Sequence, residues 1–362
     1  MRSIKQDDAH TTEPGLIIRE KDPENLEFPF SSLKGLITPS ERFYVRSHFP
    51  VPKLDLATWR LSVEGAVEAP CELSYNDLVE MQDRTRPALL ECAGNNRVFL
   101  ESRASGVQWE QGAVGNAEWT GVPLAELLER AGLREGATEV VLEGADQGVP
   151  SEEPRPAGEI RYARSLPLDK ALRDVLLAYR MNGETLPASH GFPLRAVVPG
   201  WYGMASVKWL SRILVTDRPF RGYFQTVDYA YWERQDGLPV RAPITETRVK
   251  AQIARPSMLE VVPRATDYRV FGAAWTGESE VVKVELSTDG GESFTEVALL
   301  GEALSHTWRL WEYVWRTPGE PGRTTLMVRA TDARGHRQPQ ERDGDRGSYM
   351  INHVLPIDVQ VH

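Results

Sequence analysis

Leu89-Leu90-Glu91-Cys92-Ala93-Gly94-Asn95-Asn96-Arg97 carries a thiol out of an apolar run and into a turn of small and polar residues. A strand is predicted over Ala88–Leu90, and it delivers Cys92 to this turn. A cysteine in such a position is either a buried small hydrophobic side chain or a thiolate that binds a metal or attacks a substrate, and the first case is the commoner one. The rest of the chain has to decide between them.

The composition is that of a globular protein with two domains. The chain has 362 residues, of which 41% are hydrophobic, so it can bury a sizeable core. Its prolines and glycines are spread out, which indicates many turns and short strands and no internal repeat. A formal net charge of −10 argues against nucleic acid or an anionic membrane surface as the main partner. We therefore expect neither, and any bound anion must be held by local basic residues.

The cysteine count and the amino terminus restrict the chemistry and the compartment. Cys71 and Cys92 form no C-x-x-C pair, which excludes a cysteine-rich zinc site and a c-type haem site but leaves one metal–thiolate bond possible. Residues 1–15 are polar, with no apolar run and no twin arginine. The expectation is a cytoplasmic protein, or a periplasmic one if a leader is missing from the sequence.

Residues 1–242 are expected to form a catalytic domain of mixed α+β class. Its first part, residues 1–40, is predicted to be a leading arm with a structural role, pinned across a domain surface by its apolar pieces Leu16–Ile18 and Phe28–Phe30. A strand is predicted over Trp59–Val67. There is no clean βαβ alternation and no glycine-rich dinucleotide fingerprint.

Two helices are predicted from their end signals. A serine N-cap begins one over Ser74–Met81, and a second, amphipathic helix over Leu124–Ala131 is closed by Gly132. The segment from Ala171 to Met181 is either helix or buried strand. Val140–Asp146 is predicted to be a buried strand that runs into a turn carrying Asp146.

Basic residues recur in three loops. Arg46 and His48 follow the aromatic, β-branched strand signal that starts at Phe43; His190 and Arg195 flank a short apolar passage; Lys208 comes soon after. Taken singly, each is more often a surface cation or a satisfied loop histidine. Together with backbone amides in glycine and proline loops, they are the groups that a protein needs to hold a phosphorylated cofactor.

Residues 243–362 are expected to form an immunoglobulin-like β-sandwich. The strand Val281–Ser287, the turn Asp289–Gly291 and the strand Phe294–Leu299 predict a hairpin, and turn signals recur about every ten residues. Trp308–Trp315 is apolar on both faces of a strand, which indicates core or a subunit interface.

Three separated motifs carry a family resemblance. They are Cys92-Ala93-Gly94-Asn95-Asn96-Arg97, Tyr44-Val45-Arg46-Ser47-His48-Phe49-Pro50-Val51-Pro52 and His190-Gly191-Phe192-Pro193-Leu194-Arg195. With Ser206-Val207-Lys208-Trp209-Leu210 and the Asp289–Gly291 turn, they resemble the sulfite oxidase family of molybdenum enzymes, in the family's order, from about residue 40 to the end of the chain. No haem-binding domain of the animal or plant relatives is found in the sequence.

The resemblance implies a set of site residues. Cys92 would be the thiolate ligand of molybdenum, with one molybdopterin per subunit. The positions that match the family's pterin-binding residues are Arg46, His48, Asp146, His190, Arg195, Ser206, Val207 and Lys208. Arg97 and Trp109 match residues of the substrate pocket, so that Cys92, Arg46, Arg97 and Trp109 are the implied catalytic residues.

The resemblance also implies a reaction and partners. The enzyme would oxidise a small anion such as sulfite to sulfate by oxygen-atom transfer, with the substrate docked near Arg46 and Arg97. A separate cytochrome-like carrier would take the electrons, because this chain has no haem. A homodimer through the C-terminal domain is expected as well.

Two positions depart from the family pattern. A family tyrosine aligns with Phe220, unless Tyr223 replaces it from a shifted register, and a second-domain arginine that helps to hold sulfite falls at Glu280. An anion in place of that cation would repel a dianionic substrate by roughly 1–4 kcal/mol.

Three hypotheses follow from the sequence. The first is a molybdenum-dependent, sulfite dehydrogenase-like enzyme. The second is a molybdopterin oxidoreductase that acts on another oxyanion or on a sulfoxide, which the two departures favour. The third is a non-catalytic β-sandwich interaction protein that has lost its metal.

Overall fold

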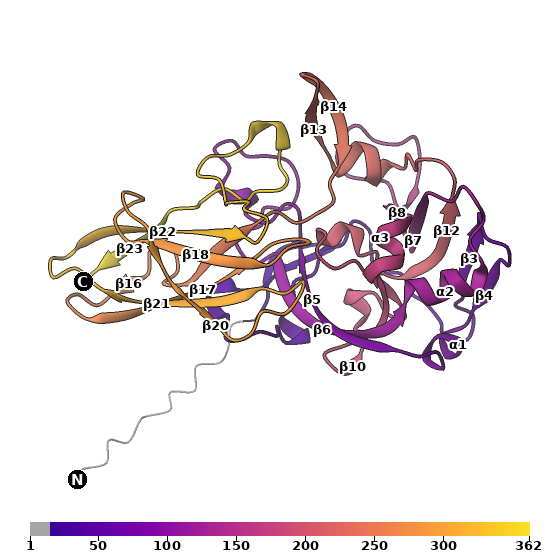
Figure 1. Cartoon of the computed structure of the whole chain (residues 1–362), viewed down its shortest axis with the longest axis horizontal. Helices are drawn as coiled ribbons and strands as arrows, with labels where there is room; N and C mark the ends of the chain where they lie inside the picture. The colour runs from indigo at the N-terminus through magenta and orange to yellow at the C-terminus, as the bar shows by residue number, and fades with distance from the viewer. Residues whose placement is uncertain (1–14) are drawn as a thin grey trace, which may run out of the picture.

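Two parts of different architecture lie side by side along the long axis of the molecule (Figure 1). The computed structural model describes residues 15–362. These residues contain only three α-helices, α1 (Tyr75–Val79), α2 (Leu124–Ala131) and α3 (Leu168–Asp174). The described chain is therefore mostly β, with less helix than the mixed class predicted from the sequence.

The first part is built on two five-stranded sheets. One has the order β10 (Glu184–Thr185), β9 (Leu176–Met181), β6 (Val114–Pro123), β5 (Arg84–Glu91), and β11 (Arg195–Val197) also pairs with β9. The other has the order β4 (Cys71–Leu73), β3 (Leu61–Gly65), β12 (Leu210–Thr216), β7 (Glu139–Gly148), β8 (Ile160–Pro167), in which only β3 and β12 run parallel.

The predicted helix ends are confirmed by their caps. Ser74 and Asp77 form a reciprocal capping box at the start of α1. Gly132 ends α2 at φ 69°, a backbone conformation that glycine adopts without strain. The segment from Ala171 to Met181, predicted as either helix or buried strand, contains both: the end of α3 and then β9.

The leading arm forms a small hairpin, β1 (Ile17–Lys21) with β2 (Glu24–Glu27). Phe28 and Phe30 are buried in a cluster with Trp275 and Trp308 of the second part, so the arm is anchored as predicted. The other predicted anchor is wrong in part, because Ile17 and Ile18 are 37% and 59% exposed.

The second part consists of two sheets packed face to face. One has the order β15 (Lys250–Arg255), β17 (Asp267–Trp275), β21 (Arg309–Arg316), β20 (Ala298–Leu300); the other has the order β16 (Val261–Val262), β23 (Ile357–Val361), β22 (Gly322–Asp332), β18 (Val281–Ser287), β19 (Thr295–Glu296). Pairing of β18 with β19 confirms the predicted hairpin, but the predicted second strand, Phe294–Leu299, is divided between β19 and β20, which lie in different sheets. In β21, Trp311 and Trp315 belong to the core between the sheets, whereas Val314 is 64% exposed. That the sandwich is of immunoglobulin type stays a prediction.

Between the two parts a two-stranded hairpin, β13 (Ala230–Gln235) with β14 (Leu238–Pro243), projects from the molecule (Figure 1). Short helical turns complete the description: η1 (Phe30–Ser32), η2 (Ser40–Arg42), η3 (Arg97–Phe99), η4 (Ala188–His190), η5 (Gly203–Ala205), the π-helical η6 (Phe224–Asp228) and η7 (Gly344–Arg346). None of the helices in residues 15–362 has the length and hydropathy to cross a membrane.

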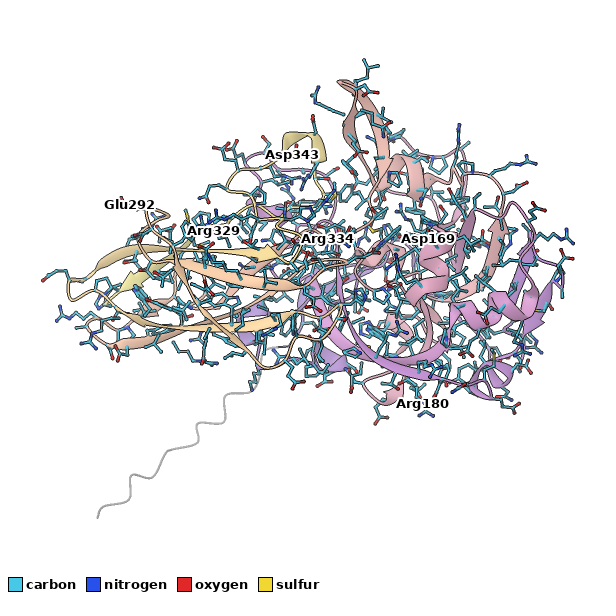
Figure 2. The ribbon with its side chains drawn as sticks, in the orientation of Figure 1. Asp169, Arg180, Glu292, Arg329, Arg334 and Asp343 are labelled. Carbon is cyan, nitrogen blue, oxygen red and sulfur yellow. The ribbon has the colours of Figure 1, made fainter. Side chains whose placement is uncertain are left out.

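Charged side chains join the two parts at their contact. Arg334 of the second part lies at this junction in Figure 2, where its guanidinium pairs with Glu246 (Nη1–Oε1 3.0 Å) and donates to the Glu278 carbonyl. Lys170 of α3, which is 1% exposed, pairs with the Glu278 carboxylate at 2.9 Å. The orientation of the second part is thus fixed by buried and half-buried ion pairs close to the loops described next.

Candidate active site

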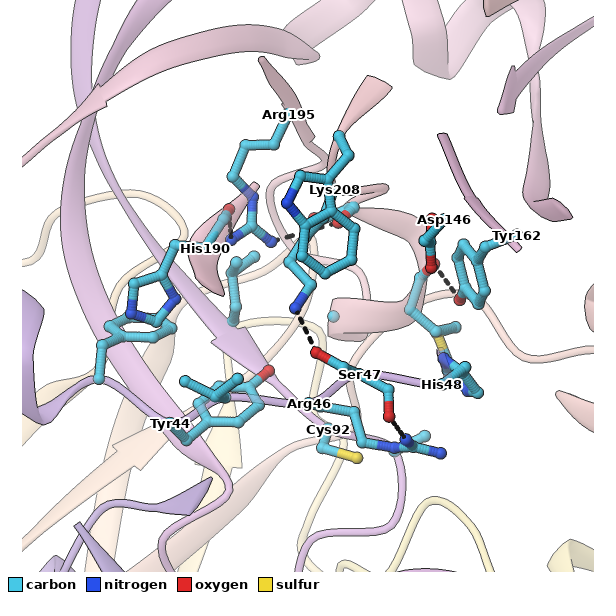
Figure 3. Close-up of a pocket in the computed structure, with 18 of the residues that line it drawn as sticks. Tyr44, Arg46, Ser47, His48, Cys92, Asp146, Tyr162, His190, Arg195 and Lys208 are labelled. Carbon is cyan, nitrogen blue, oxygen red and sulfur yellow. Dashed lines mark hydrogen bonds between the residues drawn. The ribbon is translucent and has the colours of Figure 1, made fainter. Parts of the chain in front are cut away.

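A deep cavity opens among the loops at the strand ends of the first part (Figure 3). It holds about 650 Å³ of empty space, part of it open to solvent. The predicted residues that line it are Arg46, His48, Cys92, Asp146, His190, Arg195, Ser206 and Lys208. Segments that are more than a hundred residues apart in the chain therefore meet here, and we call this space the first cavity.

Cys92 lies at the end of β5, where the chain leaves the sheet. Its amide donates to the Ala113 carbonyl and its carbonyl accepts from the Asn95 amide, so the turn is held on both sides. The side chain is 6% exposed. Burial raises the pKa of the thiol, while the charges of Arg46 and Arg97 act in the opposite direction. A thiol in this setting is deprotonated most readily when a metal ion binds the sulfur in place of the proton.

Three basic groups converge on the far side of the first cavity. Arg195 lies over the ring of Trp119 at 4.8 Å and donates to the carbonyls of His190 and Ser206. The Lys208 ammonium donates to Ser47 Oγ and to the Ser189 carbonyl, each at 2.9 Å. Burial lowers the pKa of Arg195 to about 10 and that of His190 to about 3. The histidine ring is thus neutral. The positive charge of this wall comes from Arg195 and, below its pKa of about 7, from Lys208.

The donor and acceptor set fits an anionic cofactor that also carries N–H groups. Arg195, which is buried, and Lys208, which is half-buried, have no carboxylate in hydrogen-bond contact among the described residues. Asp146 Oδ1 and Arg195 Nε are buried without a hydrogen-bond partner in residues 15–362. A phosphate would satisfy the cations, and N–H donors of a fused ring would satisfy the carboxylate. The residues present therefore fit a molybdopterin.

The bulge in β7 places Asp146 in the cavity. The pairing of β7 with β8 shifts between Glu143 and Gln147, so Asp146 leaves the regular alternation of the strand. The sequence predicted a turn here, and the structure shows a bulge inside a strand instead. A side chain at Gly144 would lie 2.4 Å from Asp146 Oδ1, so glycine is needed to leave room for the carboxylate.

The titration of these groups predicts a pH dependence for the cofactor-free protein. Burial, with the neighbouring Arg195, lowers the pKa of Lys208 from 10.5 to about 7. Between these values the unfolded chain binds the proton that the folded protein releases, so stability rises with pH above about 7. Burial raises the pKa of Asp146 from 3.8 to about 6, so stability falls as pH rises from about 4 to 6. Chemical denaturation at a series of pH values should show both limbs. Lys208→Met should flatten the alkaline limb and extend the acid limb to higher pH, because the charge of Lys208 holds the pKa of Asp146 down. An unchanged alkaline limb would contradict the assignment.

A second cavity, of about 630 Å³, lies on the other side of Cys92. Four residues line both cavities: Arg46, His48, Cys92 and Tyr229. Tyr229 Oη lies 2.7 Å from Nε2 of His48, whose pKa is well below its usual value because of burial and the charges of Arg46 and Lys208. The thiol thus lies at the boundary of two spaces, one suited to a cofactor and one to a substrate.

Arg97 lies in the wall of the second cavity because two glycines make room for it. A Cβ at Gly94 or Gly106 would come within 2.3 Å or 2.7 Å of the guanidinium, and Gly106 also has φ +88°. The guanidinium donates to the Val107 carbonyl at 2.8 Å and to the Ser348 carbonyl at 3.3 Å. These contacts fix Arg97, which is 4% exposed, beside the thiol.

The second part of the chain closes this cavity. Tyr349 lies under the guanidinium of Arg97 at 5.2 Å, and its hydroxyl donates to Asp228 Oδ1 at 2.5 Å. The amide of Met350 donates to the Ala93 carbonyl, next to Cys92. Asp343 marks the loop that leads to these residues in Figure 2. Both parts therefore build the site.

Two predicted site residues do not line either cavity. Trp109 is fully buried behind Tyr44, with ring centroids 6.5 Å apart, and packs in the same cluster as Cys92. Val207 is 1% exposed, and its carbonyl accepts from the Ala196 amide. In this structure they support the walls of the site from behind.

The two predicted departures lie elsewhere than expected. Glu280 is exposed and outside both cavities, so its expected place beside the substrate is wrong; the strand β18 that follows it turns away into the sandwich. Phe220 is also outside, whereas Tyr223, Tyr229 and Tyr349 line the second cavity. Hydroxyl groups are thus present without a tyrosine at position 220.

The sequence interpretation missed the acidic residues of the second cavity. Glu20 of the arm, Glu152 and Asp228 all line it, so the arm is part of the site as well as a structural element. The strand predicted from Phe43 is also wrong, since Val45 forms only an isolated bridge with Leu26. No local motif marks these residues, because they come from three unconnected segments.

The fold and the two cavities define the class of a molybdopterin-binding oxidoreductase. A family model described as the oxidoreductase molybdopterin binding domain matches residues 48–224, and one described as the Mo-co oxidoreductase dimerisation domain matches residues 241–352. The chain belongs to the sulfite oxidase family of molybdopterin enzymes.

The relatives are about a third identical to this chain over the aligned residues. Sulfite oxidase of Gallus gallus is 34% identical over 354 residues, covering 90% of this chain and 73% of the relative. Mitochondrial sulfite oxidase of Rattus norvegicus is 34% identical, and the chain spans 62% of its length. The NADH nitrate reductase of Solanum lycopersicum is 32% identical over 360 residues, covering 89% of this chain and 38% of the relative. The crystal structure of the sulfane dehydrogenase SoxCD from Paracoccus pantotrophus has a TM-score of 0.82 at 27% identity, covering 100% of this chain and 96% of that one.

Proposed function

We propose that the protein oxidises a sulfur compound of the sulfite type by oxygen-atom transfer at a molybdenum cofactor. The observation that carries the proposal is the position of Cys92 between the two cavities, with Arg46 and Arg97 facing the second. The relatives named sulfite oxidase support a sulfur substrate.

The first cavity would hold the cofactor. Arg195 and Lys208 would bind its phosphate, Asp146 would accept from the pterin nitrogens, and His190, Ser206 and the Val207 backbone would complete the wall. Cys92 would be the one protein ligand of the metal, because a soft thiolate suits it. The bound cofactor supplies the oxygen transfer and takes up two electrons.

The second cavity would hold the substrate. Arg46 and Arg97 attract the anion and orient it, while Tyr229 Oη and His48 offer a donor and acceptor pair at the boundary. In the net reaction sulfite and water give sulfate, two protons and two electrons. The electrons would leave to a separate carrier protein of cytochrome type. Trp109 would act by supporting Tyr44 and the Cys92 turn.

A direct assay tests this function. Molybdenum-loaded protein is mixed with sulfite and oxidised cytochrome c, and the reduction of the haem is followed by its absorbance. We expect sulfite-dependent reduction that stops when molybdenum is omitted during expression. Loaded protein that transfers no electrons from sulfite to this carrier or to ferricyanide would contradict the sulfite assignment.

A second candidate is a sulfur substrate of lower negative charge, or another oxyanion or sulfoxide. The acidic residues of the second cavity favour it, because they weaken the attraction for a dianion. The name of the structural neighbour, a sulfane dehydrogenase, is consistent with a sulfur substrate other than sulfite.

The assembly we propose is a homodimer through residues 243–362. The match of residues 241–352 to a dimerisation domain supports it. It also supports the boundary predicted between a catalytic domain, residues 1–242, and a second domain. Light scattering at micromolar concentration should give twice the mass of the chain, and a monomer would contradict the proposal.

A further inference from the structure

The lining of the second cavity carries more negative than positive charge. Its cations are Arg46 and Arg97, and its carboxylates are Glu20, Glu152 and Asp228. His48 is neutral, because burial keeps its pKa well below the usual value. A cavity built to hold a dianion should show the opposite excess. The acidic groups therefore disfavour the binding of a substrate with two negative charges.

Asp228 is the best placed of the three carboxylates. Its side chain is 12% exposed, whereas Glu20 is an exposed residue of the arm. Oδ1 accepts from the Tyr349 hydroxyl at 2.5 Å, and Oδ2 lies 3.9 Å from Nε2 of His48, a residue that also lines the first cavity. The carboxylate is thus held inside the cavity, close to the arginines that would bind the substrate.

The surroundings of Asp228 show that its charge is not consumed by a structural ion pair. No arginine or lysine forms an ion pair with it among the described residues; its contacts are a tyrosine hydroxyl and a neutral histidine. Burial raises the pKa of Asp228, while the charges of the two arginines of the cavity, Arg46 and Arg97, act through space to lower it. It therefore offsets part of the attraction that Arg46 and Arg97 exert on an anion.

We propose that Asp228 sets the charge of the substrate, so that the second cavity selects a sulfur compound with at most one negative charge over a dianion. This inference rests on the proposed function, because it takes the second cavity as the substrate site. The favoured substrate has one anionic head, which the arginines bind, and a remainder that is neutral or positively charged toward Glu152 and Glu20.

Binding of two stable anions to the molybdenum-loaded protein tests the inference. Sulfate and methanesulfonate have similar tetrahedral heads but carry two charges and one, and isothermal titration calorimetry gives a Kd for each. The wild type should bind methanesulfonate at least as tightly as sulfate. Asp228→Asn should shift the ratio of the two Kd values toward sulfate by about tenfold, since one repulsive charge is removed at short range.

Control variants separate the charge from other effects. Asp228→Glu keeps the charge and should keep the wild-type ratio. Glu153→Gln removes the charge of an exposed neighbour outside the cavity and should change nothing. Glu152→Gln removes a half-exposed charge of the cavity lining and should also shift the ratio of the two Kd values toward sulfate, by a smaller factor than Asp228→Asn. This variant tests the inference if Asp228→Asn does not fold. The inference would be overturned by wild-type protein that binds sulfate tenfold more tightly than methanesulfonate. It would also be overturned if neither Asp228→Asn nor Glu152→Gln changed the ratio of the two Kd values by more than twofold.

Turnover distinguishes this inference from the proposed function. The same proteins are assayed with sulfite and with methanesulfinate, which carries one charge and a sulfur lone pair and would become methanesulfonate on gaining one oxygen from water with release of two electrons to the carrier. If neither compound is oxidised, the proposed function fails, while the Kd ratio still reports on Asp228. If both are oxidised but the Kd ratio does not respond to Asp228→Asn, only the inference fails.

Discussion

Cys92→Ser is expected to reduce turnover to the background level while the fold remains intact. Serine has almost the same shape, and the side chain lies in a cluster with Leu90 and Trp109 where it is 6% exposed, so packing hardly changes. Its hydroxyl does not ionise near neutral pH and is a hard ligand, so the bond to a soft metal centre is lost. The cofactor should still bind, because we propose that its phosphate is held by Arg195 and Lys208 on the far wall of the first cavity.

Three measurements check this result. Turnover should be lost, the pterin extracted from the protein should remain near one per chain, and the melting temperature should stay within a few degrees of the wild type. Cys71→Ser, at the exposed cysteine of β4, is the matched control and should leave all three unchanged. Retained turnover in Cys92→Ser would refute the role of the thiol as ligand.

Lys250→Met is expected to destabilise the protein by about 3–5 kcal/mol, because it leaves a buried carboxylate without its cation. The Lys250 ammonium, 2% exposed, pairs with Glu91 at 2.8 Å and donates to Asn96 Oδ1 at 2.9 Å. Glu91 also accepts from the indole of Trp275 at 2.9 Å and from the Asn95 amide at 3.1 Å. This network joins the second part of the chain to the residues on both sides of Cys92.

Urea unfolding monitored by fluorescence gives the loss of stability, and a double variant gives its cause. Lys250→Met with Glu91→Gln removes both charges and should recover a large part of the loss. Arg316→Met is the comparison, since its pair with Asp267 is exposed on both sides and should contribute less than about 1 kcal/mol. A loss in Lys250→Met no larger than that in Arg316→Met would show that the buried pair is not needed for the fold.

Local signals in the sequence were sufficient wherever one short segment determines the structure. The helix Leu124–Ala131 was predicted with both ends correct, because Gly132 supplies the backbone conformation that stops it. The hairpin after Ser287 was predicted from its turn glycines, Gly290 and Gly291, which have φ of +76° and +98°. Most of the residues predicted to bind the cofactor do line the first cavity, since most of them lie in the motifs that carry the family resemblance.

The second cavity could not be predicted in the same way, because its walls are made by tertiary packing. Tyr349 reaches Asp228 across 121 residues of sequence, and no spacing in either segment indicates that they meet. Glu280 was placed in the site by matching Trp275–Glu280 to the family pattern, but the half-buried acid of that loop is Glu278, which binds Lys170 and Trp201. Two residues along an irregular loop separate a side chain in an interdomain contact from one in solvent.

The hydrogen bond from Met350 to the Ala93 carbonyl, with Tyr349 beside Arg97, has a consequence for how the protein matures. The first cavity is formed almost entirely by residues before 230, whereas the second is complete only when the loop before residue 350 has docked. All the residues that line the first cavity are therefore synthesised before the carboxyl-terminal part of the chain. Docking of that part adds the last wall of the substrate space, so the second cavity is complete only in a chain whose carboxyl-terminal part has folded.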